Sequence, residues 1–459
     1  MTRPDTTTDR ATAHATTARA ATAGSTSVPP RGPRAVACTR TAVPAQRRDR
    51  GTVVLVDPLH TGAGFKRAAR ERGYRVVAIY TMPREVLRAI DPEYTRGAVL
   101  NLHTRDVPRA ARSLPSDVVA VVPATEPSVD FADRLAARLG LPGNLPATAR
   151  ARRDKTEMRR RAVGSGIRVP RHQVTHAAGI RSAADALGYP AILKPPTGAG
   201  SAGVTLLPDA AAADRAVAAL TGTDLFGAPV LRYLVEEYVR GRELAVNVFT
   251  VDGVHQLVDV WEYRRPDGAD YDQPYWDVVQ LDPDDPAAAA GWAFARTVID
   301  AFGVRTGPSH TEIKLGAAGP VLIETASRLP GAHMTDVWAA HAGLRPFEAT
   351  IQALCADGTA GRGALAAFTR PVTFDARPAV CCIGNDDRPG LLTAVHGIDD
   401  VLAIPGVAQV LLGYEVGQQV PLTTGLDSVV ATVLLSAPDR HTLTDVLDRV
   451  RGTLKVEIS

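Results

Sequence analysis

Two glutamates and an arginine in the last third of the chain have the types and spacing that phosphoryl transfer requires. Glu312 lies in a run of alternating polar and apolar residues, Glu324 ends a short apolar run, and Arg328 follows four residues later. Two carboxylates can share one divalent cation, and a guanidinium presents a planar set of donors to phosphate or carboxylate. These residues predict metal-assisted phosphoryl transfer. An exposed hairpin whose charges pair with one another is an equally weighted alternative.

The neighbouring residues predict the element that positions these groups. From His310 to Leu315 polar and apolar residues alternate, so that His310, Glu312 and Lys314 share one face of a strand. The turn GAAGP then folds this strand back on the apolar strand that ends at Glu324. We therefore expect a hairpin that places the two glutamates side by side.

A second stretch has the composition of a phosphate-binding loop. The strand-like run YPAILK ends in Lys194, and the Gly-, Ser- and Thr-rich loop after it leads to another strand, which excludes a Walker loop. Glycines let backbone N–H groups approach anionic oxygens, and hydroxyls can add donors. The predicted contacts are Thr197, Gly198, Gly200, Ser201 and Gly203. A flexible hairpin without a ligand is the alternative interpretation.

Taken in order, these motifs resemble the ATP-grasp superfamily, and especially its carboxylate–amine ligases that make dipeptides. The signature of that superfamily is usually E…E-x-N-x-R, which Glu312, Glu324 and Arg328 match. The resemblance implies ATP, Mg²⁺ (or Mn²⁺ in its place) on the two glutamates, and an acyl phosphate held by Arg328. Ala326 departs from the pattern, because it stands where the superfamily has an Asn whose carbonyl oxygen completes the metal coordination. A water or a neighbouring hydroxyl would have to replace that oxygen.

The resemblance also implies that two lysines and a glutamate-rich segment bind the nucleotide. The lysines would neutralise phosphate charge, the first glutamate and the backbone after it would bind adenine, and the last glutamate would bind the ribose hydroxyls. The implied contacts are Lys155, Lys194, Glu236, Glu237, Tyr238, Val239 and Glu243. Lys155 follows Asp154, which is a predicted helix N-cap.

Residues around the hairpin are implied to serve the reacting groups. The implied catalytic residues are Arg328, Lys314 and His310, and the implied substrate contacts are Glu126, Ser309, Gly331 and Ala332. Glu126 follows a predicted strand and would hold a substrate ammonium or, equally, cap a helix. Gly331 and Ala332 are small, which predicts room for a carboxylate donor longer than alanine, such as glutamate.

The chain divides into four predicted parts, and the predicted fold class combines α/β with α+β. Residues 1–50 have hardly any large apolar side chain, which predicts a disordered tail. Residues 51–150 open with a β-α-β pattern and predict a Rossmann-like domain, although their glycines lack the G-x-G-x-x-G order of a dinucleotide site. Residues 151–345 form the predicted ATP-grasp domain, and residues 346–459 a small C-terminal α+β domain.

Composition favours small-molecule substrates over nucleic acid or membrane. Of the formal charge of +3, residues 1–50 contribute +6 and the remainder −3, so no basic face is implied. The four cysteines form no C-x-x-C pair, and no apolar run approaches the roughly 18 to 20 residues of a membrane span. We expect a cytoplasmic protein with amino-acid substrates, and the sequence allows a homodimer.

Two other functions fit part of this pattern. An ATP-grasp carboxylase of the biotin type would share the nucleotide motifs, but we identify no biotin-carrier segment, and the N-terminal half resembles that of amino-acid ligases instead. A nucleotide-binding protein that has lost catalysis is the second alternative, and Ala326 favours it. Release of ADP on mixing with Mg·ATP and amino acids would distinguish a ligase from both.

Deletion of residues 1–48 is expected to leave the melting temperature and the activity nearly unchanged, because a segment without large apolar side chains has little to bury. Thermal unfolding and ADP release by the full and shortened chains test this expectation. A marked loss of stability on deletion would show instead that the segment packs on the rest of the protein.

Overall fold

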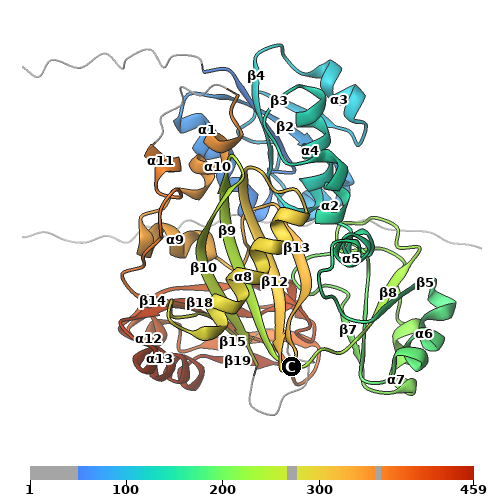
Figure 1. Cartoon of the computed structure of the whole chain (residues 1–459). Coiled ribbons are helices and arrows are strands. Elements are labelled where there is room, and N and C mark those ends of the chain that lie inside the picture. Colours follow the sequence, from blue (N-terminus) through green and yellow to red (C-terminus); the bar gives the residue numbers. More distant parts are fainter. Residues whose placement is uncertain (1–49, 266–275, 357–362) are drawn as a thin grey trace, which may run out of the picture. The chain divides into compact units, whose positions relative to one another are not determined.

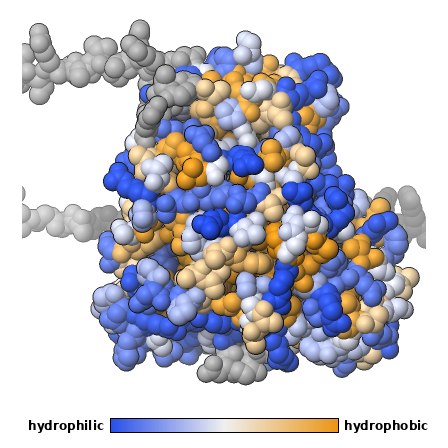
Figure 2. All heavy atoms as spheres, in the orientation of Figure 1, coloured by the Kyte–Doolittle hydropathy of each residue, from blue (hydrophilic) through white to orange (hydrophobic). Residues whose placement is uncertain are grey.

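The computed structural model describes residues 50–265, 276–356 and 363–459, and Figure 1 labels its elements. The predicted tail therefore lies outside the described residues, apart from Arg50. No helix in these three ranges is long and apolar enough to cross a membrane. On the face seen in Figure 2, hydrophilic and hydrophobic side chains are interspersed.

The first strands of the chain are rich in valine and form a parallel sheet, as expected when helices cover both faces. The strands are β1 (Thr52–Val56), β2 (Arg75–Tyr80), β3 (Leu100–His103) and β4 (Val118–Pro123), in the order β3-β2-β1-β4. The helices are α1 (Gly64–Glu71), α2 (Arg84–Ile90), α3 (Val107–Ser113) and α4 (Val129–Arg138). This arrangement confirms the predicted Rossmann-like sheet.

A second, antiparallel sheet carries the glycine-rich loop. Its strands are β5 (His172–Thr175), β6 (Ala191–Lys194), β7 (Thr205–Leu207) and β8 (Tyr233–Glu237), in the order β5-β8-β6-β7. The helices of this region are α5 (Lys155–Gly164), α6 (Ile180–Leu187) and α7 (Ala210–Ala218). Asp154 caps α5 as predicted, since its carboxylate accepts from the backbone N–H groups of Thr156 and Glu157. The glycine-rich loop connects β6 to β7 and thus has a strand on either side.

The largest sheet joins the predicted hairpin to the C-terminal part of the chain. Its order is β13-β12-β9-β10-β11-β14-β18-β16. The strands are β9 (Arg242–Val251), β10 (Val254–Arg264), β11 (Asp277–Gln280), β12 (Gly307–Gly316), β13 (Gly319–Ala326), β14 (Arg377–Ile383), β16 (Val407–Leu412) and β18 (Ala431–Ala437). Because β14 bonds directly to β11, the strands after residue 345 extend this sheet rather than only packing against it.

Helix α8 (Pro286–Ala301) runs beside the hairpin on one face of this sheet (Figure 1). Its alanines share an apolar cluster with Val246 and Ile313. The approach is close, because a Cβ at Gly291 would lie 3.3 Å from Val246 Cγ2. Ile313 therefore faces a core, as its place in the alternating run predicts, and Glu312 faces the opposite side.

The C-terminal part contains elements that the sequence pattern does not predict. A third small sheet has the order β17-β15-β19, with β15 (Gly390–His396), β17 (Gln419–Val420) and β19 (Lys455–Ile458). β17 and β19 are short, and most side chains of β15 and β19 are exposed or half-buried, so their alternation is weak. The α-helices that the structure describes after residue 330 are α9 (Met334–Ala342), α10 (Pro346–Leu354), α11 (Gly363–Ala366), α12 (Ile398–Leu402) and α13 (Arg440–Thr453).

A buried carboxylate joins four elements near the centre of the large sheet. Asp259, on β10, accepts hydrogen bonds from Asn247 Nδ2 at 2.7 Å and Trp338 Nε1 at 2.7 Å, and from Gln280 Nε2 at 3.3 Å. These donors lie on β9, α9 and β11. Because an unpaired buried polar group costs about 1–3 kcal/mol, this acid supports the packing of all three donors.

Replacing Asp259 with Ala is expected to lower the free energy of unfolding by roughly 3 kcal/mol or more, because buried donors lose their acceptor and a cavity remains. Chemical denaturation followed by tryptophan fluorescence measures the change. The matched control is Asp284→Ala, which removes an exposed acid. Equal stabilities of the two variants would contradict a structural role for the buried carboxylate.

Candidate active site

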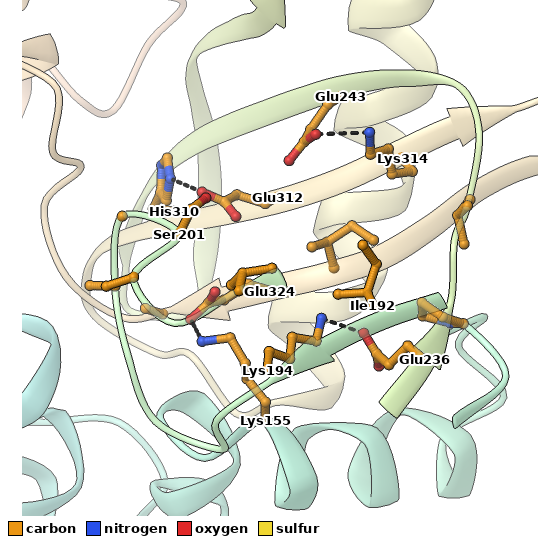
Figure 3. Close-up of a pocket in the computed structure, with 18 of the residues that line it drawn as sticks. Lys155, Ile192, Lys194, Ser201, Glu236, Glu243, His310, Glu312, Lys314 and Glu324 are labelled. Carbon is orange, nitrogen blue, oxygen red and sulfur yellow. Dashed lines mark hydrogen bonds and ion pairs between the residues drawn. The ribbon is translucent and has the colours of Figure 1, made fainter. Parts of the chain in front are cut away.

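One cavity gathers most of the residues that the sequence singles out. Its walls come from α5, the β6 strand and the loop after it, β8, β9 and the hairpin (Figure 3). The predicted residues that line it are Glu126, Lys155, Lys194, Gly200, Ser201, Glu236, Glu237, Tyr238, Val239, Glu243, His310, Glu312, Lys314, Glu324 and Arg328. Ile192 and Ile323 add apolar surface. Side chains from distant parts of the sequence thus face one space.

The hairpin places Glu312 and Glu324 opposite each other. They are register partners across β12 and β13, and the pairing next joins Ile313 to Leu322. Ile323 is therefore an extra residue, a bulge that lets Ile323 and Glu324 both line the cavity. The sequence predicts the pairing of the glutamates but gives no sign of the bulge.

At and beside the hairpin end of the cavity, three cations pair with two acids. Lys155 Nζ lies 2.8 Å from Glu324 Oε1, a contact visible in Figure 3. Arg328 Nη2 donates to Glu126 Oε2 at 2.6 Å, and Arg153 Nη1 donates to the other oxygen of that carboxylate at 3.0 Å. Glu126 is therefore an anion between two guanidinium groups.

At the other end, two acids are neutralised in the same way. Lys194 and Arg159 both pair with the buried carboxylate of Glu236. Glu243 Oε2 lies 2.8 Å from Lys314 Nζ. A nucleotide that used these groups would have to share them with, or displace, their present partners.

The surrounding charges shift the pKa values of these acids in opposite directions. Burial disfavours ionisation of Glu236, but its two cationic partners outweigh burial and lower its pKa to about 2. Burial raises the pKa of Glu324 to about 7, helped by two nearby carboxylates, although Lys155 opposes the shift. A cation beside Glu324 would relieve this repulsion, so the electrostatics of the hairpin fit a divalent ion.

The hairpin supplies the oxygen donors that Mg²⁺ prefers, in Glu312 and Glu324. Within the described ranges, no group of three or more His, Cys, Asp or Glu side chains is already disposed to hold an ion. The hydroxyls beside Ala326 do not complete such a group, because Thr325 Oγ1 bonds to Thr311 Oγ1 at 2.8 Å and Ser327 does not line the cavity. Two carboxylates therefore fit a divalent ion, and neither of these hydroxyls adds a third ligand.

The glycine-rich loop divides its residues between two cavities. Gly200 and Ser201 line the main cavity with φ values of +61° and +64°, in the left-handed region. The backbone N–H of Leu426 donates to Gly200 O at 3.1 Å and so ties the loop to the C-terminal part. Thr197 differs from the prediction: its hydroxyl donates to Asp224 at 2.5 Å, and it lines the second cavity.

Several further predicted residues lie outside the lining of the main cavity. They are Gly198, Gly203, Ser309, Gly331 and Ala332. Gly198 O accepts from Arg153 Nη1 at 3.1 Å. Ala332 is half-buried with φ +49°, and a Cβ added to Gly331 would meet no atom within 4 Å. The roles that the resemblance implies for these residues stay predictions.

The structure adds residues that sequence reasoning missed. Arg159 lies four residues after Lys155 on α5, a spacing that places both on one helix face and could have been noticed. Tyr263 OH lies 3.3 Å from Glu312 Oε1, and no sequence signal marks it. Glu126 does not cap the helix after β4, because Thr125 and Ser128 make that cap.

Two segments of the chain match known domain families. Residues 187–336 match the ATP-grasp domain, and residues 386–459 match the L-amino acid ligase C-terminal domain 2. An uncharacterized protein of Sinorhizobium fredii, y4rH, is 26% identical over 355 residues, which are 75% of this chain and 69% of that protein. Dapdiamide A synthase of Enterobacter agglomerans is 28% identical over 222 residues, or 47% of this chain and 52% of that protein.

Solved structures share the fold. The L-amino acid ligase from Bacillus licheniformis superposes with a TM-score of 0.67 at 17% identity, covering 89% of this chain and 99% of that one. The N5-carboxyaminoimidazole ribonucleotide synthetase from Thermotoga maritima gives 0.60 at 18% identity, covering 89% and 100%. With an ATP-grasp domain followed by an L-amino acid ligase C-terminal domain, the chain is an enzyme of the ATP-grasp L-amino acid ligase family.

Proposed function

We propose that this enzyme joins the carboxylate of one amino acid to the amine of another, through an acyl phosphate, and forms a dipeptide-like amide, ADP and phosphate. The observation that carries the proposal is the cavity in which three lysines, six glutamates and an arginine of the predicted site residues meet. The likeness to dapdiamide A synthase supports a place in the biosynthesis of a specialised metabolite, such as an antibiotic.

The nucleotide would lie between β6, β8 and the hairpin. Adenine would rest on Ile192 and the backbone of Glu237 to Val239, and the ribose hydroxyls would replace Lys314 as partners of Glu243. The buried pair of Glu236 with Arg159 is better suited to holding Lys194 in position than to accepting from adenine. We therefore assign adenine recognition mainly to the backbone.

The phosphates would lie over Lys155, Lys194 and the loop at Gly200. Mg²⁺ held by Glu312 and Glu324 would neutralise charge on the two terminal phosphates. Lys155 now contacts Glu324, and it would turn to the phosphates when that carboxylate has another partner. The lysines thereby offset the negative charge that phosphoryl transfer concentrates in the cavity.

The carboxylate to be activated would approach Arg328, whose guanidinium lines the cavity. Arg328 would hold the acyl phosphate and the oxyanion that forms when the amine attacks the carbonyl carbon; the carbonyl re-forms as phosphate leaves and the amine loses its proton. Glu126 orients Arg328, since their side chains are 2.6 Å apart, and it could exchange that partner for a substrate ammonium. We propose cytoplasmic amino acids as the substrates.

The rival functions have specific observations in their favour. The fold is shared with carboxyaminoimidazole ribonucleotide synthetases, but the match of residues 386–459 to a ligase C-terminal domain favours amide formation over carboxylation. Loss of catalysis is suggested by Ala326, which contributes no metal ligand. Mass detection of an amide product, formed together with ADP from an amino-acid mixture, tests the proposed reaction against both rivals.

Lys194→Met and Glu324→Gln are each expected to lower turnover about 10²- to 10³-fold, because each removes a charge that faces the phosphates or their cation. The fold should persist, since Glu236 keeps Arg159 when Lys194 is lost. ADP release and circular dichroism measure the two effects. Lys455→Met is the matched control, since this lysine is exposed on β19. Near-normal turnover in either site variant would contradict the assignment of that residue to the phosphate and metal site.

Ala332→Trp is expected to narrow the range of carboxylate donors toward glycine and alanine by steric exclusion. The prediction rests on the position of this residue shortly after Arg328. A panel of amino-acid donors, scored by ADP release on the wild type and the variant, tests it after circular dichroism confirms folding. An unchanged donor profile in a folded variant would show that residue 332 does not border the donor.

A further inference from the structure

His310 lies opposite Ala326, which occupies the position where the ATP-grasp pattern has an Asn metal ligand. His310 and Ala326 are register partners across β12 and β13, and Glu312 and Glu324 are the next such pair on the same face. Residues two apart on a strand point to the same side, so the four positions form one patch, and all four line the cavity. Ala326 contributes only a methyl group to this patch.

The two ring nitrogens of His310 have different surroundings. Nδ1 lies 2.7 Å from Asn247 Oδ1, while Nε2 lies 3.3 Å from Glu312 Oε1 and 3.4 Å from Tyr263 OH. An amide oxygen only accepts hydrogen bonds, so Nδ1 must carry a proton and donate it. Nε2 is therefore the nitrogen that is left to act toward Glu312 and the cavity.

The orientation of Asn247 is itself fixed from behind. Its Nδ2 donates to Asp259 Oδ1 at 2.7 Å, and Asp259 also accepts from Trp338 and Gln280. Because the carboxylate accepts these bonds, the amide nitrogen must face Asp259 and the amide oxygen must face His310. A buried chain from a carboxylate to Nδ1 is the arrangement that orients imidazoles bound to metal through their other nitrogen.

We propose that His310 Nε2 is a third protein ligand, beside Glu312 and Glu324, of the divalent ion used in the proposed ligase reaction. The inference rests on that proposed function, and it requires the three side chains to converge when the ion binds, because they are not already disposed to hold one. Adjacent ligands of an octahedral ion with bonds of about 2.1 Å lie about 3 Å apart, near the 3.3 Å between Nε2 and Glu312 Oε1. The imidazole thus supplies from β12 the donor that an Asn at position 326 of β13 would supply.

A nitrogen ligand changes which ion the site prefers. Carboxylate and water suit Mg²⁺, whereas imidazole also suits later first-row metals. We therefore expect the site to favour Mn²⁺ over Mg²⁺ more strongly than a site built from carboxylates and an amide oxygen. The alternative is that His310 only hydrogen-bonds to Glu312 and never contacts the ion.

The contact between the ion and His310 can be tested directly by pulsed EPR. The full-length protein is produced with ¹⁵N-labelled histidine and measured in the presence of Mn²⁺ and ADP. The wild type should show coupling of Mn²⁺ to ¹⁵N, and His310→Ala should lose it. His255→Ala is the matched control and should keep the coupling, because His255 bonds to Thr250 and Asp300 outside the cavity. Absence of histidine coupling in the wild type overturns the proposal without need of any variant.

A ligand exchange within the patch gives a second, independent readout. His310→Ala should weaken Mn²⁺ binding in the presence of ADP about 10-fold or more. Adding Ala326→Asn should restore binding and shift the preference toward Mg²⁺, because an amide oxygen then replaces the imidazole. Equal Mn²⁺ affinities of the wild type and a folded His310→Ala variant would contradict the proposal.

These measurements separate the inference from the proposed function. Histidine coupling without an amide product would leave the metal assignment intact and reject the ligase reaction. An amide product without histidine coupling would support the ligase and reject His310 as a ligand. Melting temperatures of all variants identify any loss of metal binding that comes from unfolding.

Discussion

Charges that are buried in one cavity must be matched there, and this requirement governs the arrangement of the site. A lysine or glutamate removed from water is tolerated when an opposite charge and hydrogen bonds compensate it. The pairs Lys155–Glu324 and Lys314–Glu243 meet this need across different strands and helices, and the triad of Lys194, Arg159 and Glu236 meets it at the base of the cavity. The fold can hold the groups for catalysis because it first neutralises them.

The pairs at the cavity are not equal, and their differences suggest the order in which ligands use them. Glu236 is bound by two cations and strongly favours its ionised form, so it acts as a fixed support. Glu324 has one cation and other carboxylates nearby, and its pKa of about 7 marks the least satisfied charge of the set. A divalent ion would therefore be drawn first to the Glu324 end, and its arrival would free Lys155 for phosphate. Metal and nucleotide binding would then reinforce each other.

Local patterns predicted the hairpin, the Asp154 cap and the strand–loop–strand around the glycines, because alternation, capping and turn residues act over a few positions. Long-range contacts left no such trace. The bulge at Ile323 depends on how β13 meets β12. The contacts of Arg153 depend on Glu126, in the turn after β4, and on Gly198, in the glycine-rich loop, which approach it from other parts of the chain. Thr197 had the right side chain for a phosphate contact, but Asp224, 27 residues later, determines where its hydroxyl points.

The choice of lysine at three positions is informative in a chain that otherwise uses arginine. Only Lys66, Lys155, Lys194, Lys314 and Lys455 are lysines, and three of them line the cavity. Arginine would keep the charge but would bring a wide planar fork that binds carboxylates in two-point contacts. A small ammonium can leave a glutamate and meet a phosphate oxygen with little rearrangement of its neighbours. Arg159 holds Glu236 through such a two-point contact, whereas Arg328 donates to Glu126 through one nitrogen and to the carbonyl of Leu329 through another. We propose that these arginines supply fixed charge in the site and that the lysines supply mobile charge.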